Sequence, residues 1–276
     1  MNNLEYDHAD IFPDIKAIQQ QFHLLLRTVP SGGLILAPSE DDDVNEVLHQ
    51  GCWAPVARVG GKVVRKPVQL DTGEHWCVAQ TSRDDTFEIL LNDESQGTVS
   101  WSLTGAHNRS NALNAIAAAR HAGVPVAVSI AALNQFVGVK RRMEVIFEDP
   151  HTVIYDDFAH HPTAIRSTLQ GLRDAASADE IIAIIEPRTH TMSLGTLQSD
   201  LATCCAAADR VIWFRGDNIT WDLYQLAQDC VIDARVEDDI ERLIDSLLAM
   251  PALNGDRRRH LVIMSNGAFG GIYKNI

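Results

Sequence analysis

The sequence predicts an α/β protein of two domains, the second built as a parallel sheet with helices on both faces. The 276 residues are 46% hydrophobic, enough for one large or two ordinary cores. Short β-like runs dominate the middle of the first half, whereas strand-like and helix-like segments alternate through the second half. We expect the boundary near residues 137–140, dividing the chain into 1–138 and 139–276.

The first half begins with a helix and a short strand. Apolar residues over 14–29 recur at helical spacing, which predicts an amphipathic helix packed on a sheet. Residues 34–37 are typical of a short buried strand, and the acidic run 40–43 fits the N-terminus of a helix that runs toward Gly51. Four β-like runs follow and predict a meander: 56–59, 76–80, 87–91 and 98–103.

Gly60-Gly61-Lys62 lies between the first two of these runs. A phosphate-binding loop of the GxxGKT type needs an earlier glycine and a Ser or Thr after the lysine, and both are missing here. We interpret the glycine pair as a hairpin turn. The sequence therefore offers no phosphate loop of this type.

A candidate nucleotide site precedes the next helical run. Gly105 and His107 lead into Asn108 and Asn111, and if the helix starts near Arg109 both carboxamides can face a ligand at its N-terminus. A carboxamide both donates and accepts, which suits the edge of a base. Alternatively, Asn108 is an N-cap and Asn111 is solvated.

Glycine and proline delimit the helices at the end of the first half. The alanine-rich helix should end at Gly123, a typical residue after a helix C-terminus, and Pro125 blocks its continuation. A second helix is expected over about 129–136, ending at Gly138.

The second half alternates between the two element types. Helices are expected over 164–172, 197–207, 223–227 and 240–250. Strands are expected over 145–147, 153–155, 181–185, 211–214, 231–232 and 261–264. This alternation favours a parallel sheet covered on both faces.

Titratable residues follow the strand 153–155. Asp156 and Asp157 come first, then His160 and His161, and Pro162 is pre-set for the first position of a helix. Because ligands bind at the carboxyl ends of strands in open α/β sheets, these side chains are candidates for a functional site. A solvated loop with a capping Asp is the alternative.

Composition limits the possible partners. A formal net charge of −14 argues against nucleic acid and against an anionic membrane. The odd number of cysteines and the absence of CxxC spacing indicate free thiols rather than disulfides or a zinc site. We expect a cytoplasmic protein, because neither a leader-like start nor an apolar run of membrane-spanning length is present.

Several motifs in order resemble the Mur ligase family. They are NLEYDH at 3–8, GAHNRSN at 105–111, RRME at 141–144, DDFAHHP at 156–162, EPRTHTM at 186–192 and SNGAFGG at 265–271. The likeness covers essentially the whole chain. It implies a remnant of the central ATPase domain over 1–138 and a Rossmann-like C-terminal domain over 139–276. The family's UDP-binding N-terminal domain and phosphate loop are missing, so we expect a fragment, a truncated gene product or a diverged protein.

The resemblance also implies an activity, namely ATP-dependent amide ligation in peptidoglycan recycling. The carboxylate of UDP-N-acetylmuramate would take the γ-phosphoryl group of ATP, and the free amine of L-alanyl-γ-D-glutamyl-meso-diaminopimelate would then displace phosphate. ATP and Mg²⁺ are the implied cofactors, and the missing N-terminal segment of the same ligase is the implied partner. We expect the chain alone to be inactive, because it lacks the phosphate loop.

Residue roles follow from the same resemblance. His8 matches a magnesium ligand, and His107, Asn108 and Asn111 match the adenine site. Arg142 matches an arginine that reaches the nucleotide, and Asp157 matches the acid that orders the nucleotide on domain closure. His160 would contact phosphate or the attacking amine. Alternatively, Arg142 pairs with Glu144 and His160 is a hydrogen-bonding residue at the helix entry.

The acceptor site is expected after two further strands. Arg188 follows strand 181–185, where its guanidinium can hold a peptide carboxylate through two parallel hydrogen bonds, and we group Thr189 and His190 with it. The turn Ser265-Asn266-Gly267 could direct backbone N–H groups at an anion, although an ordinary strand-to-helix turn is the alternative.

Two other classes of function compete with this interpretation. One is a metal-dependent hydrolase that uses Asp156, Asp157, His160 and His161, with His190 as a further ligand. The other is a non-catalytic module that binds a nucleotide or a peptide.

Overall fold

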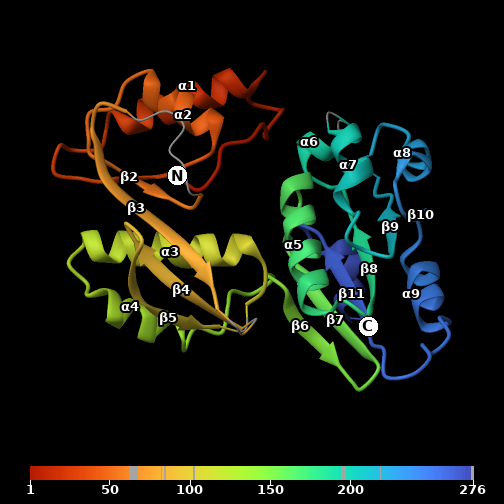
Figure 1. The fold of residues 1–276 in the computed structure, drawn as a ribbon. Helices are drawn as coiled ribbons and strands as arrows, with labels where there is room; N and C mark the ends of the chain where they lie inside the picture. Colours follow the sequence, from red (N-terminus) through yellow and green to blue (C-terminus); the bar gives the residue numbers. More distant parts are fainter. Residues whose placement is uncertain are drawn as a thin grey trace. The chain divides into compact units, whose positions relative to one another are not determined.

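A computed structural model describes residues 1–61, 68–81, 83, 85–101, 103–193, 195, 197–217 and 219–274. The chain divides into two compact units, Met1–Val137 and Gly138–Ile276 (Figure 1). Each unit is described by itself.

The first unit contains a five-stranded sheet with the strands in sequence order. The strands are β1 (Ile35–Pro38), β2 (Val56–Val59), β3 (Asp71–Gln80), β4 (Thr86–Leu91) and β5 (Glu94–Ser100). The expected meander is confirmed for β3 to β5, which pair antiparallel. In contrast, β1, β2 and β3 pair in parallel.

The hairpin turn expected at Gly60-Gly61-Lys62 stays a prediction, because the arm that would follow it, residues 62–67, lies outside the described residues. The strand before the glycine pair, β2, and the next described strand, β3, run in the same direction. Lys62, the third residue of that sequence motif, lies outside the described residues.

In the described part of the first unit the helices are α1 (Ile15–Leu26), α2 (Asp42–His49), α3 (Ala106–His121) and α4 (Val126–Leu133). The carboxylates of Asp14 and Asp41 accept backbone N–H groups at the starts of α1 and α2, as is usual for N-caps. Two apolar cores form. One joins α1 and α2 to β1 and β2, and the other joins α3 and α4 to β2–β5.

The boundaries of α3 and α4 differ in part from expectation. Helix α3 begins at Ala106 after the N-cap Gly105, so the start expected near Arg109 is wrong by almost one turn. Its end is as predicted: Gly123 has a φ of 94°, a value that costs glycine little. Helix α4 begins directly after Pro125, a residue that ends one helix and precedes the next.

The second unit is a six-stranded sheet in the order β10-β9-β8-β11-β7-β6. Its strands are β6 (Glu144–Glu148), β7 (Thr152–Asp157), β8 (Glu180–Ile185), β9 (Arg210–Phe214), β10 (Asp233–Glu237) and β11 (Arg259–Met264). The predicted parallel sheet is confirmed for β7 to β11. The edge strand β6 pairs antiparallel with β7, which the alternation alone did not indicate.

Helices cover both faces of this sheet (Figure 1). They are α5 (Pro162–Ala175), α6 (His190–Ser193), α7 (Gln198–Cys204), α8 (Leu223–Asp229), α9 (Ile240–Leu248) and the 3₁₀ segment η1 (Phe269–Lys274). Strand β8 shows why both faces of the sheet need a cover of helices, because its side chains enter an apolar core on each face. Ile181 and Ile185 enter the core with α5, α7 and α8, whereas Ile182 and Ile184 enter the core with α9 and η1. A strand buried on both faces has no polar alternation, as the sequence indicated.

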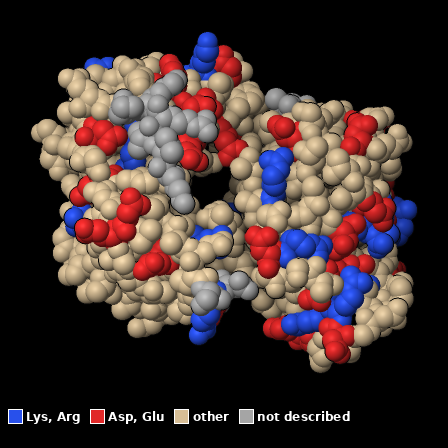
Figure 2. Space-filling model, viewed as in Figure 1, with Lys and Arg blue, Asp and Glu red and all other residues tan. Residues whose placement is uncertain are grey.

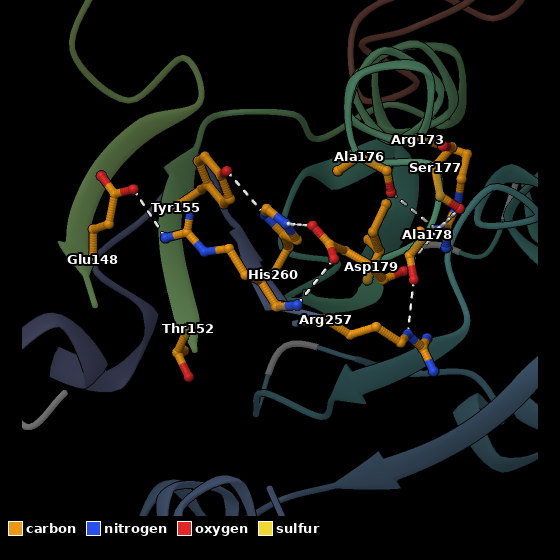
Figure 3. A network of polar contacts seen from close by, with 12 residues as sticks. Glu148, Thr152, Tyr155, Arg173, Ala176, Ser177, Ala178, Asp179, Arg257 and His260 are labelled. Atoms are coloured by element: carbon orange, nitrogen blue, oxygen red, sulfur yellow. Dashed lines mark hydrogen bonds and ion pairs between the residues drawn. The ribbon is translucent and has the colours of Figure 1, made fainter. Parts of the chain in front are cut away.

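A polar network lies at the amino-terminal ends of β8 and β11 (Figure 3). The buried ring of His260 contacts Asp179 through Nε2 at 3.0 Å and the hydroxyl of Tyr155 through Nδ1 at 3.0 Å. Because a carboxylate only accepts, the neutral ring donates from Nε2 and accepts the Tyr155 hydroxyl at Nδ1. Burial raises the pKa of Tyr155 to about 12, against the opposing charge of Arg258.

The five cysteines all lie in the described ranges and form no disulfide with one another there. Among the residues that the structure describes, no helix is long and apolar enough to cross a membrane.

Candidate functional site

Three strand ends meet at the carboxyl-terminal edge of the second sheet. Strand β11 lies between β7 and β8, so Asp157, Ile185 and Met264 bring their following loops to one edge. The loops carry most of the residues that the sequence singled out. Ligands of open α/β sheets bind at such an edge.

Asp156 is engaged by two residues at this edge. The Nε of Arg141 lies 3.1 Å from its Oδ2, and the hydroxyl of Tyr273 donates to its Oδ1 at 2.7 Å. Asp156 is buried, and a buried carboxylate needs such partners. Arg141 was not selected from the sequence, where it appeared only as the first residue of the RRME motif.

Asp157 is held by the backbone on both of its oxygens. Oδ2 accepts the N–H of Met143 at 2.9 Å, and Oδ1 accepts the N–H of Ala159 at 2.8 Å. Burial raises the pKa of Asp157, although these two N–H groups and the charge of Arg142 oppose the shift. The carboxylate therefore fixes the loop before β6 to the end of β7.

Arg142 and Glu144 do not form the pair considered above. The carboxylate of Glu144 accepts the backbone N–H of Arg141 at 2.8 Å. The guanidinium of Arg142 lies 5.5 Å from the centre of the Phe158 ring, which is a cation–π distance.

The two histidines after β7 play different structural parts. His161 is the N-cap of α5, and its Nδ1 accepts the N–H of Thr163 at 3.4 Å. His160 contacts the carbonyl of Phe158 through Nδ1 at 2.7 Å. Because a carbonyl only accepts, Nδ1 is the donor, and the lone pair of the neutral ring is on Nε2. Nε2 of His160 is thus the ring nitrogen that can accept a proton.

Glu186 and Ser265 join β8 to the turn after β11. The buried Ser265 hydroxyl donates to Oε2 of Glu186 at 2.5 Å and accepts the N–H of Gly267 at 2.9 Å. The N–H of Ser265 donates to the carbonyl of Asp157 at 3.1 Å. These two backbone N–H groups are therefore engaged within the protein, and they are not directed at an anion as considered above.

Arg188 lies against the same turn. A Cβ added to Gly267 would be only 2.3 Å from Nη1 of Arg188, so the guanidinium occupies the space that a side chain would need. The side chain of Arg188 is exposed to solvent, and the Oδ1 atom of Asn266 is buried without a hydrogen-bond partner in the described structure. The structure thus brings Arg188 together with Ser265, Asn266 and Gly267.

Thr189 and His190 follow Arg188 into α6. The Oγ1 atom of Thr189 accepts the N–H of Met192 at 3.3 Å, which caps the first turn of that short helix. His190 is the first residue of α6.

The candidate adenine residues lie at the start of α3 in the first unit. Asn108 is in the first turn, and its amide nitrogen donates to the carbonyl of Thr104 at 2.7 Å. The N-cap alternative for Asn108 is wrong, because Gly105 holds that position. Asn111 is exposed one turn later, and its oxygen accepts the amide of Asn2 at 3.1 Å. His107, between them and Gly105, is half-buried.

His8 is exposed in the N-terminal segment of the first unit. Its carbonyl accepts the N–H groups of Ile11 and Phe12 at 2.9 Å, and its φ is 54°. No group of three or more His, Cys, Asp or Glu side chains in the described ranges is placed to hold a metal ion.

Two Mur ligase domains match this chain. The Mur ligase middle domain matches residues 1–119, and the Mur ligase glutamate ligase domain matches residues 141–266. The chain belongs to the Mur ligase family, with sequence of its middle and C-terminal domains.

Two curated ligases and one crystal structure are among the proteins similar to this chain. The chain is 42% identical to the UDP-N-acetylmuramate–L-alanyl-γ-D-glutamyl-meso-2,6-diaminoheptandioate ligase of Escherichia coli strain K12, over 100% of this chain and 58% of that ligase. It is 38% identical to the ligase of the same name from Haemophilus influenzae, with the same coverage. The crystal structure of a murein peptide ligase from Psychrobacter arcticus 273-4 superposes with a TM-score of 0.68 and 34% identity, covering 100% of this chain and 55% of that one. The chain therefore spans 58% of the length of these two curated ligases.

Proposed function

We propose that this chain provides the peptide-acceptor site and part of the nucleotide site of an ATP-dependent ligase. The ligase would join UDP-N-acetylmuramate to L-alanyl-γ-D-glutamyl-meso-diaminopimelate through an acyl phosphate, in peptidoglycan recycling. The names of two curated relatives that align over the whole of this chain support this reaction. The observation that carries the proposal is the placement of Arg188 against the Ser265–Gly267 turn.

Arg188 suits a peptide acceptor that carries several carboxylates. Arg188 is an exposed residue at the sheet edge where ligands bind, and a guanidinium can hold a carboxylate through two parallel hydrogen bonds. Asn266, with its buried and unpartnered Oδ1, would accept an N–H of the peptide after a small movement of the turn. Thr189 and His190 lie at the same edge and complete the proposed acceptor set.

His160 would act on the attacking amine. In the neutral ring Nε2 carries the lone pair, because Nδ1 donates to the carbonyl of Phe158. Amide formation requires the amine to lose a proton, so we propose that Nε2 accepts it or orients the amine. Asp157 and Arg142 would order the nucleotide nearby, with Asp157 held at the end of β7.

ATP and Mg²⁺ are the cofactors of this proposal. The first two turns of α3 offer Asn108 and Asn111 about one turn apart, with His107 next to Asn108, which fits recognition of an adenine edge. His8 would contribute one nitrogen to a magnesium ion, and a hard cation needs oxygen ligands besides it. Bound Mg²⁺ would stabilise the charge that develops on the transferred phosphoryl group.

The proposed partners are small molecules and the remaining part of such a ligase, which would supply the phosphate loop. Nucleic acid and membrane are not proposed, because the net charge is −14. Lys and Arg are also interspersed with Asp and Glu on the second unit in Figure 2. We propose that the protein acts in the cytoplasm, where ATP and UDP-sugars are available.

The hydrolase alternative has no support from the geometry. Asp156 is engaged by Arg141 and Tyr273, and both oxygens of Asp157 accept backbone N–H groups. In the part of the chain that the structure describes, no three candidate ligands converge. A non-catalytic peptide-binding module would use the same acceptor site without binding nucleotide.

Titration calorimetry with L-alanyl-γ-D-glutamyl-meso-diaminopimelate and with ATP tests the proposal on the chain itself. We expect the peptide to bind, ATP to bind weakly, and ligation in a coupled assay to stay at background, because no phosphate loop cradles the γ-phosphoryl group. Peptide binding without any ATP binding would favour the non-catalytic module. Failure of the peptide to bind would contradict the acceptor site, and turnover that depends on Mg²⁺ would show that another group replaces the loop.

A further inference from the structure

Arg141 links three segments of the second unit that are distant in sequence. Its Nε donates to Asp156 at the end of β7, while Nη2 donates to the carbonyls of Ser265 at 2.6 Å and Gly267 at 3.0 Å. The third segment is η1, whose Tyr273 hydroxyl donates to the same Asp156 carboxylate. One guanidinium thus connects the strand end, the turn after β11 and η1.

The surroundings of Arg141 make these bonds strong. Asp156 and Ser265 are buried, and charge-assisted hydrogen bonds gain strength where water is excluded. The rings of Phe158 and Tyr273 have their centres 5.3 and 5.9 Å from the guanidinium carbon. Two aromatic faces and three acceptors leave the guanidinium little freedom to turn.

The backbone of Arg141 is fixed as firmly as its side chain. Its N–H donates to Glu144 at 2.8 Å, and its carbonyl accepts the N–H of Phe158 at 2.7 Å. Its φ is 57°, and that of Met143 is 52°, a conformation that L-residues adopt at a cost. Such backbone persists only where the surrounding contacts hold it.

We propose that Arg141 is a positioning residue for the acceptor site. Its guanidinium donates hydrogen bonds to two carbonyls of the Ser265–Gly267 turn. The turn, held in this position, provides the surface against which Arg188 lies. Arg141 does not touch the peptide. The inference rests on the proposed function, in which Arg188 and this turn bind the peptide.

Three variants of the chain separate positioning from simple stabilisation. Arg141→Gln removes the charge and the bridge, whereas Arg141→Lys keeps a positive charge beside Asp156 but cannot span the strand end and two carbonyls. Arg242→Gln is the matched control, because the exposed side chain of Arg242 forms its ion pairs with Glu237 and Asp238 in the same unit, away from the turn. The melting temperature and the affinity for L-alanyl-γ-D-glutamyl-meso-diaminopimelate are measured for each variant.

We expect Arg141→Gln to weaken peptide binding roughly tenfold, because a binding group that is misplaced loses most of its hydrogen-bond geometry. Arg141→Lys should recover much of the melting temperature but not the affinity, and Arg242→Gln should change neither. Recovery of both by Arg141→Lys would show that only the charge matters and would overturn the positioning role.

Hydrogen exchange of the backbone amides gives a readout that needs no ligand. In Arg141→Gln the Gly267 amide should exchange faster than in the parent chain, while amides of β8 should be unchanged. If the parent chain does not bind the peptide, the proposed function fails, and the exchange measurement still decides whether Arg141 holds the turn. Unchanged exchange at Gly267 would contradict the inference.

Discussion

A side chain at Gly267 would take the place of Arg188. An ideal Cβ at Gly267 lies 2.3 Å from Nη1 and 2.9 Å from Cδ and Cζ of the arginine, so the two residues cannot both keep their positions if Gly267 is replaced. Arg188 is exposed and its side chain is long, so the arginine rather than the turn should move. The proposed acceptor site therefore depends on the absence of a side chain at Gly267.

Gly267→Ala should accordingly weaken peptide binding while leaving the fold intact. The added methyl displaces the guanidinium, which then has to give up part of its contact with the carboxylate. Titration calorimetry with the tripeptide measures the effect, and Gly32→Ala is the control, because nothing lies within 4 Å of a Cβ there. Unchanged affinity in Gly267→Ala would mean that Arg188 acts from another position or not at all.

Arg188→Lys should weaken peptide binding by about 1–3 kcal/mol and leave the affinity for nucleotide unchanged. A lysine ammonium is a point charge, and it cannot reproduce two parallel hydrogen bonds to one carboxylate. Arg242→Lys, at an exposed ion pair of α9, provides the matched exchange away from the site. Equal peptide affinities for the parent chain and Arg188→Lys would place Arg188 outside the acceptor site.

The two asparagines of α3 should respond differently to alanine. Asn108→Ala loses the hydrogen bond to the Thr104 carbonyl, which should cost about 0.5–1.5 kcal/mol of unfolding free energy. Asn111→Ala removes an exposed side chain and should change that free energy by less than about 0.5 kcal/mol. Urea unfolding of both variants checks this.

In a ligase that contains the phosphate loop, Asn111→Ala should raise the KM for ATP and leave kcat close to normal. A contact with the base is made about equally in the ground state and in the transition state. Steady-state kinetics at saturating peptide measures both constants. If much of the variant fails to fold and the folded fraction shows unchanged ATP kinetics, Asn111 has a structural role instead.

Tyr155→Phe should destabilise the chain by about 1–3 kcal/mol at neutral pH, because it leaves the buried Nδ1 of His260 without its donor. Burial raises the pKa of Tyr155 from 10.0 to about 12, so its contribution is complete below pH 10 and is lost as the pH rises toward 12. The difference in unfolding free energy between parent and variant should therefore shrink over that range.

Urea unfolding at neutral pH and at several values between pH 10 and 12 measures this difference. Tyr224→Phe is the control. Tyr224 is half exposed on α8, so this substitution should change the free energy of unfolding little at neutral pH. A difference for Tyr155→Phe that stays constant up to pH 12 would show that the hydroxyl does not titrate with folding.

Local signals in the sequence predicted much of the fold. The acidic run 40–43 lies at the start of α2, as predicted, and Gly123 follows the end of α3 with a positive φ. The apolar run Ile181–Ile185 is a strand buried on both faces. Each of these features depends on residues within a few positions of one another, so a single stretch of sequence is enough to indicate it.

The direction of strand pairing was not predictable in the same way. Strands β2 and β3 pair in parallel, although their apolar patterns do not distinguish parallel from antiparallel pairing. Apolar alternation indicates which face of a strand is buried, and it is the same for either direction of the neighbour. The first residue of α3 was also missed, because Gly105 caps the helix without a side chain that the sequence could reveal.

The sequence by itself determined the family motifs, the α/β class and the positions of Asp157, Arg188 and Ser265 at the ends of strands. Only the tertiary structure decided which of two adjacent arginines holds the site together. Arg141 and Arg142 have the same chemistry, yet the partners of Arg141 include Ser265, which is 124 residues away. Such contacts form only after three strands have aligned at one edge of the sheet. The sequence around Arg141 therefore does not indicate them.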